Sequence, residues 1–129
     1  MKASARRRKG YAHTVTVEHH ALIVDEPVER GGGDTGPRPT ALLAMSLASC
    51  TAITIEMYAD RKQWDVGDLE VGVDYDIDPE GTSRFEVMLK LPTALDDQQM
   101  ERLRRIAARC PVHRVLKGKV AITDRIERV

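Results

Sequence analysis

The stretch Thr40–Arg61 constrains the fold most, because it is long, nearly uncharged and apolar on all sides. Glu56 is the only charged residue between Ala41 and Ala59. Its small and aliphatic residues fall on every face of a helix, which is typical of a helix buried all round. At 1.5 Å per residue this helix is about 30 Å long, enough to cross a small domain. We therefore predict a central helix with the other elements packed around it.

A membrane span is not expected from this stretch, although its length would allow one. Besides Glu56 it contains five serine and threonine hydroxyls: Thr40, Ser46, Ser49, Thr51 and Thr54. The N-terminal residues are basic, but no apolar segment of a secretory signal follows them. The sequence therefore predicts a cytoplasmic protein that does not enter a membrane.

The size and composition of the chain exclude several classes of protein. Its 129 residues fit one domain. The net charge is zero and only five residues are aromatic (one Trp, one Phe and three Tyr), which argues against a nucleic-acid partner. Two cysteines and four histidines without tight ligand spacing argue against a metal site. In a cytosolic protein, two cysteines are more often free thiols or a redox pair than a structural disulfide.

The first forty residues suggest strands and a loop. Residues 1–10 contain five basic and no acidic residues, and form either a disordered basic arm or the lead-in to a first strand. The segments 11–17 and 21–24 predict a hairpin at a sheet edge. Residues 25–39, with four glycines and three prolines, predict the loop that leads into the central helix. We expect residues 11–129 to form a single domain.

Beyond the central helix, the pattern predicts two strands, two helices and a last strand. Apolar and polar residues alternate through 69–77 and 85–91 around a turn, which indicates a hairpin. Asp96 is the expected N-cap of a helix that ends at Cys110, because Pro111 disfavours helical geometry in the residue before it. A short helix, Pro111–Lys117, and a strand, Val120–Ile126, follow.

This order of elements indicates an α+β fold with mostly antiparallel sheets packed on the long buried helix. A single sheet covers only one side of a helix. A helix that is apolar all round needs more cover, and a second copy of the chain would supply it. We therefore predict an intertwined homodimer.

The two cysteines are the candidate reactive groups. Cys50 lies too deep in its helix for the helix dipole to act on it, so a lowered thiol pKa would need a cation nearby. Arg38 and Arg8 are candidates by residue type alone. Cys110 would cap the short helix, where backbone N–H groups favour a thiolate. Side chains that could form apolar pocket walls are Met45, Leu47, Ile53 and Met57.

Purely structural roles remain open for the same residues. Both cysteines can be small core side chains. For Glu56 and His113 we favour solvated side chains over a role beside the thiols.

Three segments taken together carry a resemblance: GGGDTGPRP at 31–39, the helix at 41–64 and ARCPVHRVL at 108–116. In this order they resemble the OsmC/Ohr family, the osmotically inducible and organic hydroperoxide resistance proteins, and more closely its short OsmC-like branch. The resemblance implies an intertwined homodimer with two sites at the interface. It also implies that Cys50 attacks a hydroperoxide, that Cys110 resolves the sulfenic acid as a disulfide, and that an external thiol reduces the pair without any cofactor.

The chain departs from this family at the start of the helix. Many members carry a glutamate there that helps to orient an arginine, whereas this chain has Thr40 and Ala41 after Pro39. Two alternatives therefore stay beside a peroxidase. One is a protein of the same fold that binds a small apolar or electrophilic ligand at the dimer interface. The other is a structural dimer in which both cysteines are core residues.

Overall fold

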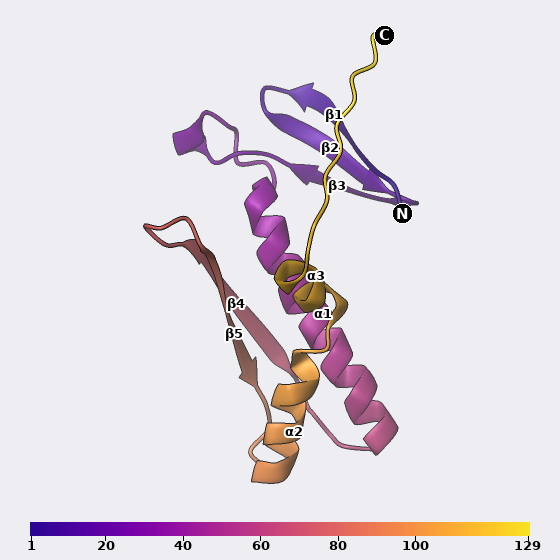
Figure 1. Cartoon of the computed structure of the whole chain (residues 1–129), viewed down its shortest axis with the longest axis vertical. Helices are drawn as coiled ribbons and strands as arrows, with labels where there is room; N and C mark the ends of the chain where they lie inside the picture. Colours follow the sequence, from indigo (N-terminus) through magenta and orange to yellow (C-terminus); the bar gives the residue numbers. More distant parts are fainter. The chain divides into compact units, whose positions relative to one another are not determined.

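The computed structural model describes all residues, 1–129, and groups them into two compact units. Unit 1 comprises Met1–Met45 and unit 2 comprises Ser46–Val129, with the boundary inside helix α1, Pro39–Lys62. Antiparallel sheets and helices confirm the predicted α+β class (Figure 1). The units are described one at a time below, and the prediction of a single domain over residues 11–129 stays a prediction.

Unit 1 is built on a three-stranded antiparallel sheet in the order β1-β2-β3. Strand β1 spans Ala3–Lys9, β2 spans Ala12–Val17 and β3 spans His20–Val24 (Figure 1). The predicted hairpin is confirmed as β2 and β3. The alternative of a disordered arm is wrong for β1, because its backbone pairs along β2 from Ala3 opposite Val17 to Lys9 opposite Ala12. The basic side chains are exposed, so only the backbone ladder reveals this strand.

The glycine-rich loop after β3 is held by one buried carboxylate. Asp25 Oδ2 accepts hydrogen bonds from the Gly33 backbone at 3.2 Å, the Thr35 backbone at 3.1 Å and the Thr35 hydroxyl at 2.7 Å. A Cβ at Gly32 would collide with the Glu26 carbonyl, and one at Gly36 with the Ile23 carbonyl. The glycines therefore let the loop fold back on its own backbone before α1 begins.

Asp25→Asn is expected to lower the stability of unit 1 in a pH-dependent way. Hydrogen bonds from Thr35 lower the pKa of Asp25 below its ordinary value. A carboxyl group with a lowered folded pKa stabilises the fold above its unfolded pKa of about 3.9, and this contribution is lost as the pH falls through the folded value. The asparagine amide would place its own N–H donors against the donors of Gly33 and Thr35, so hydrogen bonds to this side chain would be lost. Thermal unfolding between pH 3 and pH 7 should show a lower midpoint at pH 7 and a smaller acid-dependent loss. A variant that matches the wild type at both pH values would contradict this role.

Helix α1 begins at Pro39. Proline has no backbone N–H, and the first turn of a helix needs none, because no carbonyl of the helix is placed to accept it. Within the single chain α1 is buried on one side only, so the predicted burial on all sides by a second copy stays a prediction. The buried side chains are Leu47, Thr51, Ile55, Tyr58 and Ala59, whereas Leu43, Met45, Ile53 and Met57 are exposed. By length and apolar composition α1 also meets the criteria for a membrane span, a test that core helices of soluble proteins pass as well.

Unit 2 packs one helix and one hairpin against the second half of α1. Strands β4, Glu70–Ile77, and β5, Ser83–Lys90, form the predicted antiparallel pair. Helix α2, Asp97–Ala107, carries the predicted capping box, in which Asp96 accepts from the Gln99 backbone at 2.7 Å. The buried core joins α1 to α2 through Ile55, Tyr58, Leu95, Leu103 and Ile106.

A polar contact also ties α2 to α1 in unit 2. Arg102 Nε donates to the Tyr58 hydroxyl at 2.8 Å, and this hydrogen bond lowers the pKa of Tyr58. Trp64 meets the Tyr58 ring edge-on, with centroids 5.7 Å apart. The middle of α2 is therefore fixed beside the C-terminal part of α1.

Two predicted details of unit 2 are wrong. Helix α2 ends at Ala107 rather than at Cys110, because the chain turns there, with the Arg109 and Cys110 amides donating to Ile106 and Ala107. The short helix α3, Pro111–Lys117, is confirmed. The strand predicted for Val120–Ile126 is absent, since residues 118–129 join neither sheet and form no backbone ladder.

Candidate redox site

The sulfur of Cys110 lies in the core of unit 2, at the corner between α2 and α3. Cys110 is the N-cap of α3, as predicted, and its side chain has 0% exposure. Its Sγ accepts a hydrogen bond from the His113 backbone N–H at 3.2 Å and one from the Thr51 hydroxyl at 3.9 Å. Two donors from different helices therefore converge on one buried sulfur.

Cys50 is half-buried on α1, and its thiol is a neighbour of Cys110. Burial raises the pKa of Cys50, and the adjacent Cys110 raises it further. The Val112 backbone N–H and the Thr54 hydroxyl act against this rise without cancelling it. Both cysteines are free thiols. The structure thus brings together the two cysteines that the sequence singled out, although they are far apart along the chain.

The pH dependence of Cys50 alkylation should report this environment. A thiolate is the reacting form, so iodoacetamide should modify Cys50 with a midpoint above the ordinary thiol pKa of about 8.5. Cys110→Ser removes a neighbour that raises the pKa, and its midpoint should move down. Thr54→Val removes a group that lowers the pKa, and its midpoint should move up. Shifts of the same sign in both variants would contradict the arrangement.

The remaining predicted site residues are distributed over both units. Leu47 is buried in unit 2, so it is a core side chain there, whereas Ile53 and Met57 are exposed. Met45, Arg38 and Arg8 belong to unit 1. Their roles beside the cysteines stay predictions.

Arg8, one of the two candidate cations, occupies β1, and its guanidinium donates to the Thr14 hydroxyl at 3.2 Å. Arg38 is exposed in the loop before α1. The groups that shift the pKa of Cys50 are Cys110, Thr54 and the Val112 backbone, besides burial, and none of them is a cation.

Sequence reasoning missed the two threonines beside the sulfurs. Thr51 and Thr54 follow Cys50 by one residue and by about one helical turn, and their hydroxyls serve different sulfurs. The available signal was the presence of hydroxyl side chains within an apolar helix, which above served only as an argument against a membrane span. His113 contributes its backbone N–H, and Glu56 is exposed as expected.

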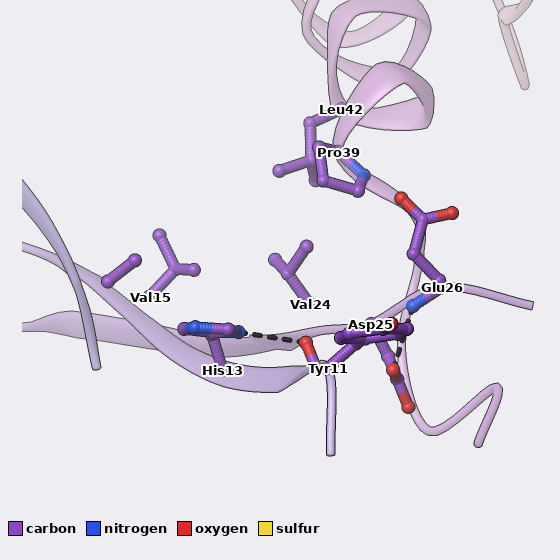
Figure 2. Close-up of a pocket in the computed structure, with 9 residues that line it drawn as sticks. Tyr11, His13, Val15, Val24, Asp25, Glu26, Pro39 and Leu42 are labelled. Atoms are coloured by element: carbon purple, nitrogen blue, oxygen red, sulfur yellow. Dashed lines mark hydrogen bonds between the residues drawn. The ribbon is translucent and has the colours of Figure 1, made fainter. Parts of the chain in front are cut away.

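Unit 1 contains a separate apolar hollow of about 510 Å³ on one face of its sheet. Figure 2 shows His13, Val15 and Val24 on the strands, with Leu42 and Pro39 from the first turn of α1. His13 Nδ1 lies 2.8 Å from the Tyr11 carbonyl, and Glu26 lies at the rim of the hollow (Figure 2). Such a surface suits an apolar side chain or ligand.

Comparisons with known proteins agree on one fold. The family model described as OsmC-like protein matches residues 31–124. An OsmC-like protein from Mycoplasma pneumoniae superposes with a TM-score of 0.77 at 18% identity, covering 91% of this chain and 86% of that one. The organic hydroperoxide resistance protein OhrB of Bacillus subtilis gives 0.61 at 24% identity, with 91% and 90% coverage.

A third solved structure is that of a Vibrio cholerae protein described as an organic hydroperoxide resistance protein, with captopril bound in one of its active sites. It gives a TM-score of 0.65 at 27% identity and covers 92% of this chain and 85% of that one. Comparison with curated proteins found no match.

Proposed function

Because the chain belongs to the OsmC-like family, we propose that it reduces organic hydroperoxides with the thiol pair Cys50 and Cys110. The observation that carries the proposal is the proximity of these two sulfurs in unit 2. Similar folds occur in proteins described by their resistance to organic hydroperoxides, which supports a role in stress defence. The proposed site requires no metal or cofactor.

The proposed reaction has three balanced steps. The Cys50 thiolate attacks one oxygen of the hydroperoxide, so the O–O bond breaks, Cys50 becomes a sulfenic acid and an alcohol leaves after protonation. Cys110 then attacks the sulfur of Cys50, which releases water and forms a disulfide. Two equivalents of an external thiol reduce this disulfide and are themselves oxidised to a disulfide.

We infer that the working form is a cytoplasmic homodimer. The exposed apolar side chains of α1 are Leu43, Met45, Ile53 and Met57, and a second copy of the chain would remove them from water. A partner would also be the source of the missing cation, since burial and Cys110 hold the pKa of Cys50 high in the single chain. Arg8 and Arg38 are the proposed candidates for this cation.

The proposal is tested by single-turnover oxidation of the fully reduced protein. An organic hydroperoxide and hydrogen peroxide are each mixed with the protein at equal concentration, and free thiols and intact mass are followed in time. We expect two thiols to be lost per chain, faster with the organic hydroperoxide, because the proposed apolar walls Met45, Leu47, Ile53 and Met57 would favour an organic substrate. Oxidation no faster than that of a small free thiol would refute the proposal.

A second candidate is a protein of the same fold that binds a small apolar or electrophilic ligand. The raised pKa of Cys50, the absence of the family glutamate near Thr40 and the apolar hollow of unit 1 favour it. Under this alternative, mild oxidation would stop at a sulfenic acid on Cys50. An apolar fluorescent probe would bind, and Leu42→Asp in the hollow would weaken that binding.

A further inference from the structure

The two sulfurs of the proposed redox pair differ in their access to solvent. Cys110 has 0% exposure, whereas Cys50 is half-buried. A thiolate opens a disulfide by approaching one sulfur in line with the S–S bond, so it needs an open path to that sulfur. Association with another chain can only reduce the exposure of a sulfur, so it would not open a path to Cys110. Cys50 is therefore the sulfur that a reductant can reach.

Each sulfur accepts from one threonine hydroxyl and one backbone N–H, and those at Cys50 come from Thr54 and Val112. Cys110 Sγ accepts from the Thr51 hydroxyl at 3.9 Å and from the His113 backbone at 3.2 Å. When a disulfide opens, the departing sulfur takes the electron pair of the bond and becomes a thiolate. Hydrogen bonds to that negative charge stabilise it. At Cys110, which is shielded from water, the Thr51 hydroxyl and the His113 N–H are the groups that would stabilise the sulfur when it departs as a thiolate.

Thr51 is held in a buried position beside Cys110. Its side chain is 1% exposed on the buried face of α1, and its hydroxyl points across to Cys110 rather than to solvent. A valine has nearly the same shape and would fill the same space. The hydroxyl is therefore not required for packing, and the contact with Cys110 gives it a use.

We propose that a thiol reductant opens the Cys50–Cys110 disulfide at the Cys50 sulfur, and that Thr51 is a positioning residue for Cys110 as the leaving thiolate. In the first step, the reductant thiolate forms a bond to Cys50 and the S–S bond breaks toward Cys110, which later takes up a proton. In the second step, another thiol attacks the mixed disulfide, which frees Cys50 and releases the oxidised reductant. This inference rests on the proposed thiol pair and names the sulfur that is attacked.

The test begins with chemical oxidation, so that it does not depend on peroxidase activity. Diamide converts the reduced protein to the disulfide, and 2-mercaptoethanol is then added as the reductant. The reaction is quenched at intervals with N-ethylmaleimide in denaturant, and peptides are analysed by mass. We expect the mercaptoethanol adduct on Cys50 and the maleimide on Cys110. An adduct that accumulates on Cys110 would overturn the proposal.

Variants of Thr51 test its role separately. Removing a hydrogen bond to a charged group should slow the first step of reduction by roughly tenfold in Thr51→Val. Thr51→Ser keeps the hydroxyl and should restore the rate, whereas Thr54→Val, which alters the hydroxyl beside Cys50, should leave Cys110 as the leaving group. Equal reduction rates in Thr51→Val and wild type, with both folded by thermal unfolding, would overturn the role of Thr51. Failure of diamide to form any intramolecular disulfide would instead refute the thiol pair of the proposed function.

Discussion

Replacing Cys50 with serine is expected to abolish hydroperoxide-dependent oxidation of this protein. A serine hydroxyl cannot form a sulfenic acid and is a far weaker nucleophile than a thiolate at neutral pH. The rate of thiol loss in Cys50→Ser should fall to the rate of an unactivated thiol, a loss on the order of a thousandfold or more. The measurement is stopped-flow oxidation with an organic hydroperoxide, followed by thiol counting.

The matched variant Cys110→Ser separates the two roles. Without a resolving thiol, the reaction should stop at a sulfenic acid on Cys50, which dimedone captures as a mass increase on that residue. The first oxidation should remain fast, because Cys110 is not the attacking group. If Cys110→Ser abolished the first oxidation while Cys50→Ser retained it, the assignment of the two roles would be reversed.

Leu103→Ala is expected to cause a large loss of stability in unit 2. Leu103 is 0% exposed in the cluster that joins α2 to α1. Truncating a buried leucine to alanine leaves a cavity and costs about 2–5 kcal/mol of the free energy of unfolding. Because α2 leads directly to Cys110, the variant should also form the Cys50–Cys110 disulfide more slowly at temperatures where it remains folded.

Urea unfolding of Leu103→Ala measures the stability, and Val115→Ala on α3 is the control. Val115 is 61% exposed, so its truncation should change the free energy of unfolding by less than about 0.5 kcal/mol. Similar losses in the two variants would mean that the α1–α2 contact does not dominate the stability of unit 2.

Much of the fold could be predicted from local sequence patterns. Alternation gave the β2–β3 and β4–β5 hairpins, and capping chemistry gave the starts of α2 and α3 at Asp96 and Cys110. Strand β1 was ambiguous because Arg6, Arg7 and Arg8 give it no apolar face, so that only pairing with β2 defines it.

The site could be predicted only in part, because its polar contacts are not local. Cys50 and Cys110 stood out as the two cysteines of the chain, and the core between α1 and α2 brings them together. The hydroxyl of Thr51 meets a sulfur 59 residues away, and no spacing rule reveals such a contact. The strand predicted at Val120–Ile126 failed for a related reason, since a strand requires a neighbour that the local pattern cannot supply.

The placement of Cys110 at the corner after α2 links the redox state of the protein to the stability of its folded state. A bond from Cys110 to Cys50 would enclose a loop of about 60 residues (110 minus 50) that contains β4, β5 and α2. In the chain-entropy picture, closing such a loop in the unfolded ensemble stabilises the folded state by about 4 kcal/mol. The oxidised protein would then unfold at a higher temperature and resist proteolysis longer than the reduced protein. Reduction would return it to a form that unfolds and is degraded more easily.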